Sequence, residues 1–201
     1  LFGLPRLGTI NCHAGNLPFY RGRNVLNWVL INDEKEFGIT VHYIDDGVDT
    51  GDIIMQETYP IDDADNYATL LEKAYSECPV ILHRSIQAIR AGTATAIPQS
   101  SFGSAGLICS QRLPGDEILD WSSSSRQVFN FVRALSDPGP KATTRLGTTI
   151  VKINKVELLP NSPSYKGIPG AILTKDDAGF LVKTSDSYVK IIEWDSSIRL
   201  K

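Results

Sequence analysis

The stretch from residue 8 to residue 22 reads GTINCHAGNLPFYRG and decides how the first part of the chain is organised. Residues 8–13 predict a short buried strand that ends in polar side chains, and the Gly and Pro that follow mark residues 14–22 as a loop. Residues 24–31 carry apolar side chains at helical spacing, and residues 39–44 are rich in β-branched and aromatic residues. The order strand, helix, strand is typical of an α/β domain.

A second strand-like run and a long helical pattern come next. Residues 53–59 predict the strand, and residues 65–91 predict the helix, because apolar side chains recur there on one helical stripe. Asp65 is the expected N-cap and Gly92 the expected C-terminal glycine. Pro79 lies inside the pattern, so we expect the helix to be kinked or split there.

The character of the chain changes after residue 92. Residues 92–115 are rich in Thr, Ala, Ser, Gly and Pro and predict a linker, and residues 122–136 predict one more helix. Close-spaced short strands then predict a small β-barrel or sandwich, at residues 143–145, 149–159, 170–174, 180–184 and 188–193. We therefore expect an incomplete α/β domain at residues 1–115, linker included, and a helix with a small β domain at residues 116–201.

Composition narrows the class of protein. Of 201 residues, 42% are hydrophobic and 21% charged, which is ordinary for a globular chain, and three widely spaced cysteines read as reduced thiols of a cytoplasmic protein. No run of eighteen apolar residues is present, so we expect no membrane span. Residues 1–140 carry a net charge of −7 and residues 141–201 one of +4. A net charge of +4 on residues 141–201 is small for a nucleic-acid-binding protein.

Asn11, His13 and the loop around Asp49 form the strongest candidate for chemistry. Asn11 and His13 are two residues apart on a strand, so their side chains project from the same face. If that strand and the one beginning at Ile39 are parallel neighbours, their carboxyl ends meet, and Asp49 joins the pair. In acyl transfer to an amine, His13 would take the proton, Asp49 would orient the imidazole, and the Asn11 amide would stabilise the developing oxyanion.

The other polar residues carry weaker signals. Cys12 and His13 are adjacent and face opposite sides of a strand, and no third ligand follows at metal spacing, so we expect no metal site. His42, in a strand, and His83, on a helix, are interpreted as structural.

Residues 11–22 resemble the N-x-H-x-S/G-x-L-P-x-x-R-G signature of 10-formyltetrahydrofolate-dependent formyltransferases. Residues 38–42 and 45–54 resemble the second signature of that family, in the same order and at a similar separation. A less specific resemblance continues through Ile118, Asp120-Trp121 and residues 133–140, which are similar to the start of the C-terminal domain in methionyl-tRNA and sugar N-formyltransferases.

The resemblance implies a partial Rossmann-like formyltransferase domain followed by a small C-terminal β-barrel-like domain. The first strands of the family's domain are missing, so we expect Leu1 to begin a fragment. The family's catalytic residues fall on Asn11, His13 and Asp49, and the co-substrate is expected to be 10-formyltetrahydrofolate. The loop expected to contact this folate consists of Ile44, Asp45, Asp46, Gly47 and Val48.

For the acceptor, the resemblance leaves two main candidates. The run from Arg21 to Trp28 looks more like the amino-sugar enzymes than the tRNA enzymes, so we predict a nucleotide-linked amino sugar, as in lipopolysaccharide biosynthesis. The expected acceptor-binding residues are Asn16, Tyr20, Arg21 and Arg23, since arginine suits a diphosphate. Methionyl-tRNA is the alternative, and a catalytically silent binding or assembly module is a second one. A homodimer is compatible with either.

Overall fold

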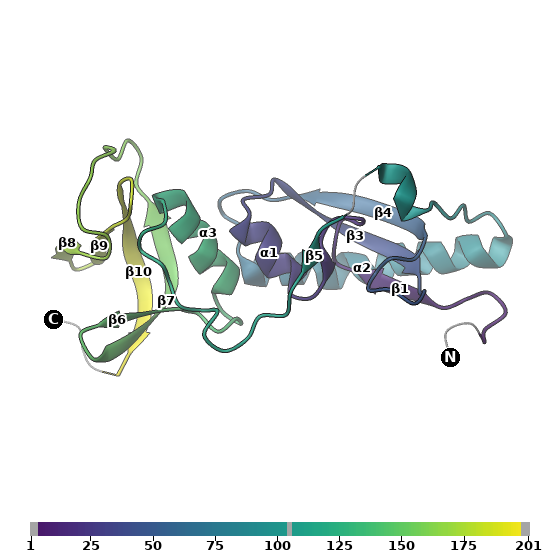
Figure 1. Cartoon of the computed structure of the whole chain (residues 1–201), viewed down its shortest axis with the longest axis horizontal. Helices are drawn as coiled ribbons and strands as arrows, with labels where there is room; N and C mark the ends of the chain where they lie inside the picture. Colours follow the sequence, from purple (N-terminus) through teal and green to yellow (C-terminus); the bar gives the residue numbers. More distant parts are fainter. Residues whose placement is uncertain (1–3, 104–105, 198–201) are drawn as a thin grey trace. The chain divides into compact units, whose positions relative to one another are not determined.

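The protein is described by a computed structural model that covers residues 4–103 and 106–197 (Figure 1). The chain forms two compact units, called unit 1 and unit 2 below. Unit 1 consists of Leu1–Val29, Glu34–Ala64 and Thr69–Arg112, and unit 2 consists of Leu30–Asp33, Asp65–Ala68 and Leu113–Lys201.

Unit 1 contains a three-stranded sheet with the strand order β1-β3-β4. These strands are β1 (Ile10–His13), β3 (Glu36–Tyr43) and β4 (Ile53–Pro60), and each neighbouring pair is antiparallel. Phe37, Ile39 and Val41 of β3 are fully buried and form the centre of the core of this unit. The β-branched and aromatic residues of this segment therefore form a strand, as expected, and the structure places it at the centre of the sheet.

The parallel pairing expected for β1 and β3 is wrong. In the antiparallel register, Ile10 pairs with Tyr43 and His13 with Thr40, so the carboxyl end of β3 lies beside the amino end of β1. The chain then turns back through residues 44–52 before it enters β4. Asp49 consequently approaches β1 from a loop that folds back over the strand pair, and not from a strand end shared with His13.

Most of helix α1 (Val25–Ile31) and of helix α2 (Tyr67–Ala91) also belongs to unit 1. α2 packs against β1 and β4, since the Cys12 thiol contacts the Cys78 carbonyl at 3.7 Å and the Tyr59 hydroxyl donates to Glu77. Its buried residues are Leu70, Ala74, Ile81 and Ser85. The predicted apolar stripe was therefore partly wrong, since it included Tyr75 and Ile86, which are exposed. Within the described residues, no helix has the length and apolar character needed to cross a membrane.

Pro79 neither ends nor splits α2, which runs through it as one helix. A proline removes the hydrogen-bond donor for the carbonyl four residues earlier, here that of Tyr75. Tyr75 is 73% exposed, so the missing hydrogen bond falls on the solvent-facing side of the helix. Gly92, with a φ of +70°, follows the last turn as the expected C-terminal glycine.

The segment predicted as a linker carries regular structure. Ile97 forms a β-bridge with Ile53, a 3₁₀ helix follows at Gln99–Phe102, and β5 (Ile108–Cys109) pairs in parallel with β2 (Arg21–Gly22). This segment therefore returns along unit 1 and contributes to the same region as the loop after β1.

Unit 2 consists of α3 (Ser125–Leu135) and a five-stranded antiparallel sheet. α3 begins with a capping box, in which the side chains of Ser124 and Gln127 accept from each other's backbone N–H. The strand order is β6-β7-β10-β9-β8. The five strands lie close to the predicted ranges, at Ala142–Leu146, Thr149–Leu158, Ile172–Asp176, Gly179–Lys183 and Tyr188–Ser196 for β6 to β10.

The core of unit 2 lies between α3 and this sheet. Val128, Val132 and Leu135 of α3 are buried together with Ile153 and Val189 of the sheet. The moderate apolar content of the helix is thus concentrated on one face. The mixed α/β organisation, with a separate small sheet unit at the C-terminal side, is confirmed.

Candidate active site

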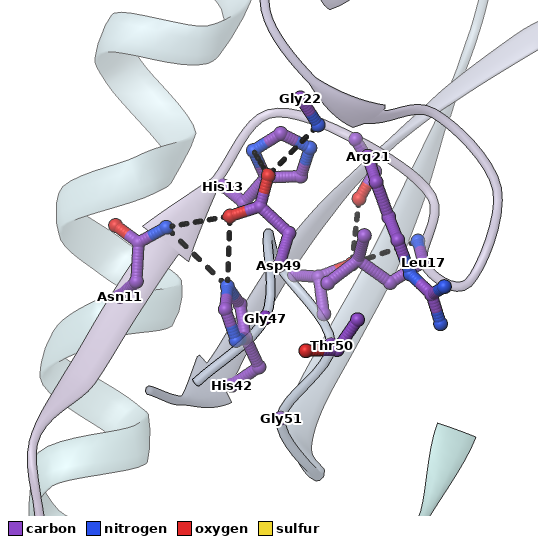
Figure 2. Close-up of polar contacts among 12 residues, drawn as sticks. Asn11, His13, Leu17, Arg21, Gly22, His42, Gly47, Asp49, Thr50 and Gly51 are labelled. Carbon is purple, nitrogen blue, oxygen red and sulfur yellow. Dashed lines mark hydrogen bonds and ion pairs between the residues drawn. The ribbon is translucent and has the colours of Figure 1, made fainter. Parts of the chain in front are cut away.

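Asn11, His13 and Asp49 lie together in unit 1, as Figure 2 shows. The Asn11 amide nitrogen, Nδ2, lies 3.4 Å from Asp49 Oδ1, and His13 Nδ1 lies 3.7 Å from Asp49 Oδ2. All three side chains are partly buried. The structure thus brings together the three residues that the sequence singled out as catalytic.

Asp49 owes its position to an unusual backbone conformation. Its φ is +52°, in the left-handed region that non-glycine residues rarely adopt, and its carboxylate turns back toward β1 and β2. The backbone N–H of Gly22 donates to Asp49 Oδ2 at 2.8 Å. The loop after β3 and the short strand β2 therefore hold the carboxylate from two sides.

The surroundings of Asp49 favour its charged form. Burial alone would raise the pKa of this carboxyl, but the hydrogen bond with His42, the Gly22 N–H and the charges of the histidines outweigh it and lower the pKa to about 2. Asp49 is thus a carboxylate across the neutral pH range, as a residue that orients an imidazole must be.

His13 is held by an oxygen atom at each ring nitrogen. Nδ1 faces the Asp49 carboxylate, and Nε2 lies 2.7 Å from the Tyr20 carbonyl oxygen. A Cβ atom at Gly15 would lie 2.4 Å from Nε2, so the absence of a side chain there makes room for the ring. The Tyr20 carbonyl can only accept a hydrogen bond, so Nε2 carries the ring hydrogen. Nδ1, which faces Asp49, is then the nitrogen that can take up a proton, as a general base must.

His42, interpreted as structural from the sequence, belongs to the same cluster. It is 2% exposed and pairs with Asn11 across the β1-β3 ladder. Its Nε2 lies 3.3 Å from Asn11 Nδ2 and 3.5 Å from Asp49 Oδ1, and its Nδ1 lies 2.7 Å from the Tyr43 carbonyl. The place of His42 in this cluster could have been predicted only from the register of β1 and β3, which a single sequence does not supply.

The four residues predicted to bind the acceptor have different surroundings. Tyr20 is buried, and its hydroxyl donates to Glu34 at 2.5 Å. The Arg21 guanidinium donates to Gln99, and the exposed Arg23 donates to Gln111. Asn16 is partly buried, and its backbone packs closely against Gly38. Their role in binding stays a prediction.

The predicted folate loop, residues 44–48, is exposed next to Asp49. The Asp45 carboxylate accepts from the Thr50 hydroxyl and the Gly47 N–H, and these bonds lower the pKa of Asp45. Ile44 and Val48 are 37% and 59% exposed. Exposed apolar side chains thus lie beside the Asp49 carboxylate, and the contact of this loop with folate stays a prediction. In the part of the chain that the structure describes, no group of three or more His, Cys, Asp or Glu side chains is arranged so that it could hold a metal ion.

Two family models match most of the chain. The model described as formyl transferase matches residues 1–86, and the model described as formyl transferase, C-terminal domain, matches residues 114–197. The chain belongs to the formyl transferase family. The first match contains Asn11, His13 and Asp49, and the second contains the whole sheet of unit 2.

Curated relatives of this formyl transferase chain include methionyl-tRNA formyltransferases. That of Bacteroides fragilis is 34% identical over 204 residues, and that of Staphylococcus aureus is 34% identical over 187 residues. The alignments cover 96% and 93% of this chain, but only 60% and 58% of those relatives. The chain thus spans about three fifths of the length of these relatives.

Solved structures with the same fold include sugar N-formyltransferases. WlaRD, a sugar 3N-formyl transferase solved in the presence of dTDP and 5-N-formyl-THF, has a TM-score of 0.71 at 24% identity, covering 95% of this chain and 66% of that one. HypX from Aquifex aeolicus, in complex with tetrahydrofolic acid, has a TM-score of 0.67 at 22% identity, covering 95% of this chain and 32% of that one. At these identities the likeness establishes the fold.

Proposed function

We propose that this protein transfers a formyl group from 10-formyltetrahydrofolate to a primary amine, with Asn11, His13 and Asp49 as its catalytic residues. The observation that carries the proposal is their convergence in unit 1: an imidazole held by a carboxylate of lowered pKa, beside an amide donor. Membership of the formyl transferase family supports the same chemistry.

Each side chain has a separate task in this proposal. The amine nitrogen attacks the formyl carbon of the folate co-substrate, and the bond from that carbon to the folate nitrogen then breaks, so that tetrahydrofolate leaves. His13 accepts the proton that the amine loses and can pass it to the departing folate nitrogen, and Asp49 stabilises the ring while it is charged. Asn11 Nδ2 makes only long contacts, of 3.3 and 3.4 Å, so one of its hydrogens can turn to the reacting oxygen as negative charge develops there.

For the acceptor, we propose a nucleotide-linked amino sugar. The run from Arg21 to Trp28 supports it. The charges of unit 2 agree, because Lys183 is fully buried. One of the positive charges behind the net +4 on residues 141–201 is therefore unavailable to a long phosphate backbone.

Methionyl-tRNA is the second candidate acceptor. The observation that favours it is the 34% identity to methionyl-tRNA formyltransferases over nearly the whole chain, unit 2 included.

The test compares both acceptors with the complete gene product and 10-formyltetrahydrofolate. Mass spectrometry would detect N-formylation of dTDP-linked 3-amino and 4-amino sugars and of methionyl-tRNA. We expect efficient turnover of an amino sugar, and weak, salt-sensitive binding of tRNA. Turnover of methionyl-tRNA alone would show that the acceptor is methionyl-tRNA and not an amino sugar, and would leave the proposed formyl-transfer chemistry unchanged. No turnover of any amine, combined with binding of a folate analogue, would indicate a catalytically silent binding module.

A further inference from the structure

Gln99 connects two segments of the candidate site through the four hydrogen bonds of its side-chain amide. It comes from the segment that the sequence predicted as a linker, and it is 4% exposed. Its Nε2 donates to the backbone carbonyls of Asp49 and Gly51, both at 2.8 Å. Its Oε1 accepts from Arg21 Nε at 3.0 Å and Arg21 Nη2 at 2.6 Å.

The chemistry of these partners fixes the orientation of the amide. Two carbonyl oxygens require the NH₂ group, and a guanidinium requires the oxygen, so the reverse orientation would lose all four bonds. The backbone is anchored as well. Ile97, two residues earlier, exchanges both backbone hydrogen bonds with Ile53, at 2.8 and 2.9 Å. Gln99 therefore has a fixed place from which to hold the loop before β4.

The segment held by Gln99 determines where the Asp49 carboxylate points. Asp49 has a left-handed backbone, which is unfavourable for a residue with a side chain unless its surroundings hold it there. On the other side of the loop, a Cβ atom at Gly51 would lie 1.9 Å from the Tyr43 carbonyl, so the backbone of Gly51 packs directly against the end of β3. The loop is thus fixed between Tyr43 and the Gln99 amide, with its carboxylate turned to His13 and Gly22.

We propose that Gln99 is a positioning residue for formyl transfer: by tying the Asp49–Gly51 backbone to Arg21, it holds the Asp49 carboxylate against His13. The inference rests on the proposed function, because it acts through the proposed catalytic carboxylate. It also gives Arg21 a second task, since this guanidinium supports the loop as well as being a candidate for acceptor binding.

The test uses the complete gene product and three substitutions. Gln99→Met keeps the approximate shape and removes all four hydrogen bonds, whereas Gln99→Glu keeps an acceptor for Arg21 and cannot donate to the two carbonyls. Ser100→Ala, at an exposed position of the same 3₁₀ helix, is the matched control. We expect both Gln99 variants to lose roughly 10- to 100-fold in kcat with little change in the KM for 10-formyltetrahydrofolate, and the control to keep its activity.

A double-mutant cycle separates positioning from general packing. If Gln99 acts through Asp49, then Gln99→Met changes kcat by less than about threefold when Asp49→Asn is already present. An equal loss of kcat in both backgrounds would overturn the proposal, and so would unchanged kcat in both Gln99 variants.

Carbon-13 NMR of the aspartate side chains gives a readout that does not need activity. We expect the carboxyl pKa of Asp49 to rise in Gln99→Met and Gln99→Glu, and to stay low in Ser100→Ala. If the wild-type protein formylates no amine but this rise occurs, the proposed function fails and the positioning of Asp49 stands. An unchanged Asp49 titration in both Gln99 variants would overturn the positioning role, whether or not the protein is active.

Discussion

Replacing Asp49 by asparagine keeps the shape of the side chain and removes the charge that His13, His42 and Gly22 stabilise. The wild-type carboxyl has its pKa lowered from 3.8 to about 2, which corresponds to ~2 kcal/mol of folding free energy. The side chain is only 16% exposed, so solvent screening removes little of this. A carboxyl whose pKa is lower in the folded state than in the unfolded state stabilises the fold at pH values above the unfolded-state pKa. This contribution is lost as the pH falls through the folded-state pKa. Roughly half should therefore be gone by about pH 3.

Amide hydrogen exchange at about pH 5 and about pH 3 would measure this contribution unit by unit. For the β3 amides in unit 1, the stability difference between wild type and Asp49→Asn should shrink by ~1 kcal/mol at the lower pH. The β7 amides in unit 2 are the internal control and should show no such change. A difference in β3 that stays constant between the two pH values would refute the account of how this carboxylate is held.

Three further outcomes are expected. His13→Ala should lower kcat by roughly 10²- to 10⁴-fold and leave binding of a folate analogue unchanged in calorimetry, and an active variant would remove the general base from the proposal. Lys183→Met should destabilise unit 2 by ~3 kcal/mol in urea unfolding, because the buried ammonium donates to three backbone carbonyls, whereas exposed Lys175→Met should have little effect. Gly51→Ala should destabilise unit 1 by about 1–3 kcal/mol and lower kcat, since its Cβ would lie 1.9 Å from the Tyr43 carbonyl; wild-type values of both would contradict that close approach.

Much of the fold could be predicted from local patterns. The strands of unit 2 and helix α3 lie close to their predicted ranges, because alternation and capping signals act over a few residues. Pro79 was harder to interpret. Its effect depends on whether the missing hydrogen bond falls on the solvent-facing side of α2, and this follows from how α2 packs in the folded chain.

In the candidate site, too, some features follow from local sequence patterns and others depend on the folded chain. The spacing of Asn11 and His13 places both side chains on one face of β1, whatever the strand pairs with. The antiparallel partner strand and the presence of His42 could not be predicted in this way. They depend on a register between residues about thirty positions apart, fixed by the β1-β3 ladder.

The sequence by itself therefore indicated the family, the order of the longer helices and strands, and the residues proposed for the chemistry, because short motifs and side-chain periodicity are local properties of the chain. The tertiary structure decided what holds those residues in place. The Gln99 amide reaches Asp49 across 50 positions, and the Gly22 N–H reaches its carboxylate across 27. Such hydrogen bonds exist only after the chain has folded, since closing these loops has an entropic cost that the completed core must offset.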